Sequence, residues 1–257
     1  MLLQMTTPGW RLPWYYMWSP KFAVFHKIIQ DTFDDPDIFL QPIFLEQEHF
    51  DKKLYQEQGQ HHWKGCILKI DILLERLRLT ENAGHYIVFS DADMYARKGI
   101  GEKLLTYVEE GKDMYFLQET DTKKEANIGL ILLKCTEEVC AFWEQVKITV
   151  LADGSHDQGV ANTQLATTPL SWGFLDSSCM NSNMMNDTNR HTFLYCQMLC
   201  SCRGYEADVA EKLYTYLFVI SLHPYLYLID PTIQAIIAKM AEIFKHPIPP
   251  YFIYRLP

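Results

Sequence analysis

The chain has 257 residues, of which 48% are hydrophobic and 21% are charged, so it is long and apolar enough for one large globular domain. The formal net charge of -9 argues against a protein that binds nucleic acid through a basic face. Seven cysteines without paired spacing favour a reducing compartment. Because no signal peptide is evident and prolines interrupt the most apolar stretch, 213–240, we expect a soluble, cytoplasmic protein with no transmembrane segment.

The first third of the chain is predicted to alternate strands and helices. In chain order, the expected elements are a strand over 10–18, a helix over 19–33, a strand over 38–45, a loop or irregular helix over 46–60, a helix over 63–79 and a turn over 81–84. Proline in the first turn of a helix is favourable, which supports the helix that begins at Ser19-Pro20. Pro42 indicates that the second strand lies at an edge or carries a bulge.

The segment from Tyr86 to Met94, YIVFSDADM, carries the clearest chemical signal. Its apolar half predicts a buried strand that ends just before Asp91 and Asp93. Ligands bind beyond the carboxyl ends of strands in open α/β sheets. Two carboxylates at this spacing can chelate Mg²⁺ or Mn²⁺, which keeps coordination positions open for substrate phosphates.

Other interpretations of the two aspartates have to be weighed. Aspartate is common in turns that follow strands, where it caps helices or forms Asx-turns. An EF-hand loop is disfavoured because Tyr95 follows and no glycine stands at the required position. A haloacid-dehalogenase phosphatase usually carries this motif on its first strand, whereas here it lies a third of the way along the chain.

The remainder of the chain continues the alternation. The expected elements are a helix over 100–110, strands over 113–118 and 128–133, a helix over 137–150, a loop over 153–157, a short helix over 158–166, a loop-dominated segment over 170–190 and a helical tail from 206. Strands that alternate with helices predict a layered α/β fold.

Four motifs then stand in a characteristic order. A helix carrying Lys69 precedes the Asp-x-Asp strand, Asn127-Ile-Gly129 begins a later strand, Asp157-Gln158 follows, and Asn162 lies one helical turn further on. This order resembles the nucleotide-diphospho-sugar transferases of the GT-A glycosyltransferase fold. The resemblance covers about residues 60–165; the N-terminal strand and helix fit without a sharp motif, and no motif matches beyond about residue 170.

The resemblance implies an α/β fold with a GT-A-like, Rossmann-type mixed sheet flanked by helices. A catalytic domain over 1–205 would be followed by a helical C-terminal extension over 206–257. It implies transfer of a sugar from a UDP- or GDP-sugar to a glycan or another hydroxyl acceptor, with Mn²⁺ or Mg²⁺ as cofactor. The resembled families lean towards retention of configuration, and no nucleic acid is an expected partner.

Site residues carry over by position. The implied metal ligands are Asp91 and Asp93, the implied catalytic residues are Asp157 and Gln158, and the implied donor-binding residues are Lys69, Ser90, Asp91, Ala92, Asn127, Gly129 and Asn162. Lys69 would lie near the phosphates or brace the Asp-x-Asp turn. Each has a structural alternative: a solvated helix face for Lys69, a strand-start turn for Asn127 and a helix N-cap for Asp157.

Several roles stay open between alternatives. The candidates are His191 or His223 as a third metal ligand, Trp14, Tyr15 or Tyr16 for stacking on the base, and Asp153, Asp157 or Glu119 as a general base. Competing functions are an inactive binding or scaffold protein of the same fold, and a phosphatase or nucleotidyltransferase that uses the same aspartates. A nucleotidyltransferase would often show a glycine-rich basic loop after its first strand, but residues 9–21 contain one glycine.

Overall fold

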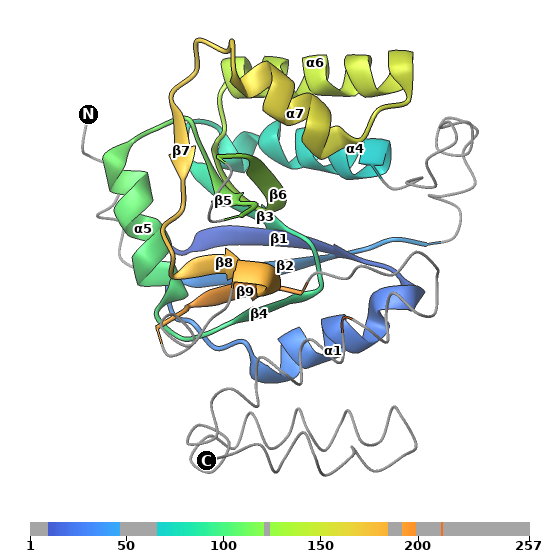
Figure 1. Cartoon of the computed structure of the whole chain (residues 1–257). Helices are drawn as coiled ribbons and strands as arrows, with labels where there is room; N and C mark the ends of the chain where they lie inside the picture. The colour runs from blue at the N-terminus through green and yellow to red at the C-terminus, as the bar shows by residue number, and fades with distance from the viewer. Residues whose placement is uncertain (1–9, 47–65, 121–123, 185–191, 199–211, 213–257) are drawn as a thin grey trace. The chain divides into compact units, whose positions relative to one another are not determined.

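The computed structural model describes residues 10–46, 66–120, 124–184, 192–198 and 212 (Figure 1). The chain forms two compact units. The first comprises Met1–Pro20, Asp35–Asp91 and Gly101–Leu175, and the second comprises Lys21–Asp34, Ala92–Ile100 and Asp176–Pro257. Each unit contains its own sheet.

The sheet of the first unit has six strands in the order β2-β1-β3-β6-β5-β7. The strands are β1 (Leu12–Trp18), β2 (Ile38–Phe44), β3 (Tyr86–Ser90), β5 (Met114–Gln118), β6 (Ala126–Lys134) and β7 (Trp172–Phe174). β1 pairs in parallel with β2 and β3, and β7 pairs in parallel with β5. β6 runs antiparallel to both β3 and β5, so the sheet is mixed, as the family resemblance implies.

Helices cover both faces of this sheet. On one face lie α4 (Cys66–Leu77), α6 (Glu137–Asp153) and α7 (Asp157–Leu165), which pack side by side (Figure 1). Their apolar sides share a core with alternate strand residues, such as Phe89 and Phe116. On the other face α5 (Ile100–Glu110) places Tyr107 against Tyr115, with ring centroids 5.0 Å apart. The central strands β3, β5 and β6 are therefore buried on both faces.

The second unit has a three-stranded sheet in the order β4-β9-β8. The strands are β4 (Met94–Ala96), β8 (Cys179–Asn181) and β9 (Tyr195–Gln197), of which β4 is antiparallel and β8 parallel to β9. Helix α1 (Ala23–Thr32) contacts β4. Short 3₁₀ turns complete the described elements at Pro20–Phe22, Thr80–Asn82 and Ser182–Met184.

The long predicted elements are confirmed within a few residues. The helix expected from residue 19 begins with the 3₁₀ turn and becomes α-helical at Ala23, and the strand expected from 128 begins earlier, at Ala126. Pro42 lies on β2, an edge strand, as expected. Among the described residues, no helix has the length and apolar character that a membrane crossing needs.

The segment 170–190, expected to be dominated by loop, contains two short strands that had no prediction, β7 and β8, and its residues 185–190 lie outside the described part of the chain. The short strands β4 and β9 also had no prediction. Each has three residues, too few to show a period, and each is defined by its pairing partner instead. The predicted loop over 47–60 and the helical extension over 206–257 lie outside the described residues, except for Lys212, so the domain division at 205 stays a prediction.

Candidate active site

The strand directions bring three chain segments to one edge of the first sheet. β3 and β5 both run opposite to β6, so their carboxyl ends lie at the same edge as the beginning of β6. Asp91 directly follows β3, Glu119 directly follows β5, and Asn127 is the second residue of β6. This edge is the usual ligand-binding edge of an open α/β sheet.

Lys69 joins helix α4 to this edge. Its Nζ donates hydrogen bonds to Asp91 Oδ1 at 2.7 Å and to the carbonyl oxygen of Ile128 at 3.0 Å. The Asp91 N–H donates to the carbonyl of Gly129 at 3.0 Å, which ties the end of β3 to β6. The Lys69 side chain is largely buried, so it is not on a solvated helix face. This arrangement braces the Asp91 turn; contact of Lys69 with phosphates stays a prediction.

Glu119 links the two amides that the resemblance assigns to the site. Its Oε2 accepts hydrogen bonds from Asn127 Nδ2 at 2.6 Å and from Gln158 Nε2 at 3.1 Å. The amide oxygens are also bonded: Asn127 Oδ1 accepts from the Gly129 N–H at 2.7 Å, and Gln158 Oε1 accepts from the Ile128 N–H at 3.2 Å. A carboxylate can accept hydrogen bonds but cannot donate them, so each amide must turn its NH₂ group, and not its oxygen, towards Glu119.

Sequence reasoning considered Glu119 only as a general base and missed this orienting role. The signal was present in its position, since Glu119 follows β5 as Asp91 follows β3. The sequence could not predict which side chains Glu119 contacts, because Asn127 and Gln158 are 8 and 39 residues away along the chain.

Asn162 lies in the same region but is engaged with backbone. Its Oδ1 accepts from the Ala126 N–H at 2.7 Å, and its Nδ2 donates to the carbonyls of Ala126 and Gln158 at 2.8 and 2.9 Å. It therefore holds the first residue of β6 against α7, beside Gln158. A direct contact with the donor stays a prediction.

Asp157 is a buried carboxylate at the first residue of α7. The helix N-cap is His156, whose side chain makes no capping bond, so the N-cap alternative for Asp157 is wrong. Asp157 Oδ1 accepts from the Gln158 N–H at 2.9 Å and lies 3.5 Å from His156 Nδ1. A carboxylate in the first helical turn is favourable because it faces the positive end of the helix dipole.

Asp153, another candidate for a general base, is exposed at the end of α6. Hydrogen bonds from the side chain and N–H of Ser155 lower the pKa of the Asp153 carboxyl. A lowered pKa makes a carboxylate a weaker base, so Asp153 is a poor candidate.

The aromatic candidates near the N-terminus belong to the core. Trp14, Tyr15 and Tyr16 are at most 1% exposed, so none presents an open ring face in this structure. Trp14 Nε1 donates to Ser90 Oγ at 2.8 Å, and the Tyr15 hydroxyl accepts from Asn82 Nδ2 at 3.1 Å. Stacking of any of these three rings on a nucleotide base is therefore not supported. The Ser90 hydroxyl, expected at the donor site, accepts its hydrogen bond from the buried Trp14.

The unit boundary falls inside the Asp-x-Asp motif. Asp91 is the last residue of its segment in the first unit, whereas Ala92 and Asp93 belong to the second unit and are buried there. The Asp93 carbonyl accepts from the Met198 N–H at 2.8 Å, which continues the pairing of β4 with β9. Asp93 Oδ2 accepts a hydrogen bond from Lys212 Nζ. The candidate third ligands His191 and His223 lie outside the described residues.

The chemistry of Asp91 and Asp93 fits a divalent cation. Both carboxylates bind a cation in this structure, the ammonium of Lys69 in one unit and that of Lys212 in the other. Within the described part of the chain, no three His, Cys, Asp or Glu side chains gather as a metal site. Mg²⁺ is commonly bound through one or two carboxylates when substrate phosphates supply further oxygens, so each carboxylate is of a kind suited to such an ion.

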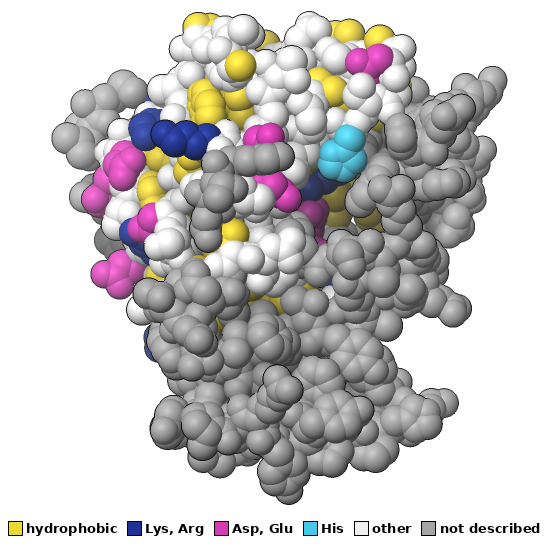
Figure 2. Space-filling view, viewed as in Figure 1, with side chains coloured by type: hydrophobic (Ala, Val, Ile, Leu, Met, Phe, Trp, Pro, Cys, Tyr) yellow, Lys and Arg dark blue, Asp and Glu magenta, His cyan; other side chains and the backbone are white. Residues whose placement is uncertain are grey.

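Charged side chains of both signs lie interspersed on the face of the described residues seen in Figure 2.

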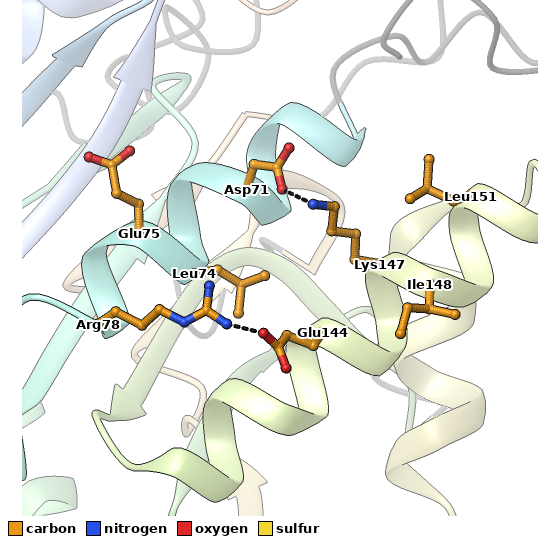
Figure 3. Close-up of a pocket in the computed structure, with 8 residues that line it drawn as sticks. All are labelled: Asp71, Leu74, Glu75, Arg78, Glu144, Lys147, Ile148 and Leu151. Atoms are coloured by element: carbon orange, nitrogen blue, oxygen red, sulfur yellow. Dashed lines mark hydrogen bonds and ion pairs between the residues drawn. The ribbon is translucent and has the colours of Figure 1, made fainter.

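A pocket in the first unit lies between α4 and α6, where Asp71 pairs with Lys147 and Arg78 with Glu144 (Figure 3). None of the eight residues that line it is a predicted site residue.

The chain is similar in structure to several solved glycosyltransferases. The chain is similar to the WbbM bifunctional glycosyltransferase in its apo form, with a TM-score of 0.51, 10% identity, and coverage of 83% of this chain and 50% of that one. It is also similar to mouse xyloside xylosyltransferase 1 (TM-score 0.49, 12% identity, 76% and 99% covered) and to the glycosyltransferase GlyE of Streptococcus pneumoniae TIGR4 (0.48, 11%, 79% and 60%). The chain thus spans only half of the WbbM chain.

The family comparison rests on sequence. No curated protein matches the chain significantly. A family model of nucleotide-diphospho-sugar transferases, however, matches residues 45–206. This match extends beyond residue 170, where no motif was recognised, and includes β8 and β9. It covers more than half of the 257 residues, and the mixed sheet has the arrangement of the GT-A glycosyltransferases. The chain belongs to the nucleotide-diphospho-sugar transferase family.

Proposed function

We propose that this protein transfers a sugar from a UDP- or GDP-sugar to a hydroxyl of a glycan or another acceptor, with Mn²⁺ or Mg²⁺ as cofactor. The observation that carries the proposal is the network in which Glu119 orients the amides of Asn127 and Gln158. It stands at the same edge of the sheet as the Lys69–Asp91 pair. A carboxylate and two amides held in fixed orientation at the ligand-binding edge of the sheet favour a site for a polar substrate over an inactive scaffold.

Donor binding falls to the charged residues. Asp91 and Asp93 would hold the metal ion, which when bound supplies positive charge for the leaving diphosphate. Lys69 adds a second positive charge beside Asp91, from a side chain already fixed by two hydrogen bonds. A charge that needs no reorganisation stabilises the transition state more than a mobile one does.

Recognition of the sugar falls to the two amides. Asn127 and Gln158 each offer donor and acceptor atoms suited to sugar hydroxyls. Their side chains are already fixed through Glu119 and the backbone of β6, so little conformational entropy is lost when the donor binds. The Asn127 amide is buried, which strengthens its hydrogen bonds.

The carboxylates near the site favour retention of configuration. An inverting enzyme needs a carboxylate that removes the acceptor proton. Glu119 Oε2 accepts from two amides, Asp157 is buried against the Gln158 N–H, and Asp153 has a lowered pKa. In the retaining reaction the acceptor oxygen bonds to the anomeric carbon as the bond to the diphosphate breaks. The acceptor proton passes to the departing diphosphate oxygen.

Product analysis tests this proposal against its competitors. The protein would be incubated with UDP- and GDP-sugars and Mn²⁺, and the products identified by NMR. Free nucleoside diphosphate with an α-configured sugar product from an α-configured donor supports retaining transfer, or hydrolysis when no acceptor is present. Inorganic phosphate would indicate a phosphatase, pyrophosphate exchange a nucleotidyltransferase, and unchanged donors an inactive protein; each of these contradicts the proposal.

A further inference from the structure

Asp93, one of the two motif aspartates, already binds a cation supplied by this chain. Lys212 Nζ donates to Asp93 Oδ2, and both residues belong to the second unit. The Asp93 side chain is 3% exposed and that of Lys212 is 16% exposed. The pair is therefore shielded from water. Opposite charges attract each other more strongly in such a buried place than at the protein surface.

A second contact holds the ammonium in place. Lys212 Nζ lies 5.6 Å from the centre of the Phe22 ring, within the range of a cation–π interaction. The Asp93 backbone is anchored independently, because its carbonyl accepts from the Met198 N–H at the end of β9. The Asp93 carboxylate is thus held in place as a binding site for a cation, and the Lys212 ammonium is bound there.

Lys212 lies outside the segment 45–206 that the family model matches, so the family match does not account for this lysine. We propose that Lys212 and the divalent cation compete for Asp93, so that Lys212 leaves the carboxylate when the metal binds. The proposal rests on the proposed function, since it takes Asp93 as a ligand of the ion.

Electrostatics gives the reason for the competition. A divalent ion on Asp93 would face the Lys212 ammonium, and two like charges in a poorly solvated place repel each other. The metal must therefore break the ion pair before it binds, and the cost of breaking it lowers the apparent affinity for the metal. Lys212 would keep the buried carboxylate compensated until the metal arrives, since an uncompensated buried charge is strongly destabilising.

Direct measurement of Mn²⁺ binding, without donor, tests the proposal. Lys212→Met removes the ammonium and keeps the length of the side chain. Lys27→Met is the matched control, since Lys27 belongs to the same unit but pairs with Asp31 on the exposed face of α1. Calorimetry or electron paramagnetic resonance should show Mn²⁺ binding roughly 5- to 10-fold tighter for Lys212→Met, in line with the usual size of coupling between two ligands, and unchanged affinity for Lys27→Met.

The other outcomes decide between this proposal and the proposed function. Equal or weaker Mn²⁺ binding by Lys212→Met overturns the competition and leaves the metal assignment standing. If neither the wild type nor Lys212→Met binds Mn²⁺, the metal assignment and the competition are both overturned.

A measurement on the wild-type protein keeps the proposal testable if Lys212→Met does not fold. Amine acetylation followed by mass spectrometry reports how accessible each lysine is. Lys212 should be acetylated several-fold faster with saturating Mn²⁺ than with none, while the rate for Lys27 stays the same. An unchanged rate for Lys212, at a Mn²⁺ concentration shown to saturate the protein, contradicts the proposal.

Discussion

Glu119 and Gln158 lie 39 residues apart in the chain and are joined by a hydrogen bond of 3.1 Å between Glu119 Oε2 and Gln158 Nε2. The same oxygen accepts from Asn127 Nδ2 at 2.6 Å. One carboxylate oxygen therefore sets which way two amides point. Hydrogen-bonded partners of this kind act on chemistry through the residues that they orient.

Replacing Glu119 by alanine should lower kcat/KM for the donor. The change removes the oxygen that accepts from both Asn127 Nδ2 and Gln158 Nε2, so neither amide is held in its orientation. The expected loss is about 10- to 100-fold, as for other orienting partners of active-site groups. Steady-state kinetics measures it. Glu125→Ala is the control, because Glu125 is exposed; an unchanged kcat/KM in a folded Glu119→Ala protein would contradict the orienting role.

Lys69→Met should destabilise the protein more than Arg78→Met. Lys69 on α4 and Arg78, just after the end of α4, each form an ion pair, but the Lys69 side chain is 12% exposed and that of Arg78 is 51% exposed. Removing Lys69 leaves Asp91 and the Ile128 carbonyl without this donor, which should cost about 1–3 kcal/mol, whereas an exposed pair is worth less than about 1 kcal/mol. Urea unfolding measures both, and equal losses would contradict the bracing role of Lys69.

Two helical glycines should respond oppositely to alanine. A Cβ at Gly101 would lie 2.3 Å from Asp35 Oδ1 and 2.7 Å from Asp37 Cβ, but a Cβ at Gly159 meets nothing within 4 Å. Gly101→Ala should destabilise by about 1–3 kcal/mol through overpacking, and Gly159→Ala should stabilise by up to about 1 kcal/mol through higher helix propensity. Thermal unfolding measures the two signs; destabilisation by Gly159→Ala would show that the space beside α7 is not open.

Stability should fall at alkaline pH, partly because of Cys135. Burial raises the pKa of this thiol to about 12, from 9.0. Between these values the folded state binds more protons than the unfolded state, so the free energy of unfolding falls as pH rises from about 9 to about 12. Urea midpoints from pH 8 to pH 11 should fall less steeply for Cys135→Ala than for wild type. Parallel curves for the two proteins would contradict this.

Sequence was sufficient where the physical signal is local. A run of buried apolar residues before Asp91 predicts β3, and apolar residues at helical spacing predict α4, both of which are confirmed. The motif order also placed Asp91 and Asn127 at strand ends, where the structure has them. These features depend on residues within about a dozen positions of one another.

Sequence was insufficient where the structure depends on distant partners. β9 has three residues and exists only because Tyr195–Gln197 pairs with β4 and β8. The hydrogen bond from Trp14 to Ser90 joins residues 76 positions apart, and it shows that Trp14, a candidate for base stacking, is a core residue. The pairing of Lys212 with Asp93 spans 119 residues and had no counterpart in any motif.

The most direct test of the proposed glycosyl transfer is metal-dependent release of nucleoside diphosphate from UDP- and GDP-sugars. It would compare the wild type, Asp91→Asn, and Asp31→Asn as a control with an exposed acidic residue paired on α1. We predict Mn²⁺-dependent release by the wild type and by Asp31→Asn, and a loss of about 100-fold or more in Asp91→Asn, the size expected when a group that stabilises the transition state is removed. Release that is independent of metal, or as fast in Asp91→Asn as in the wild type, would contradict the account.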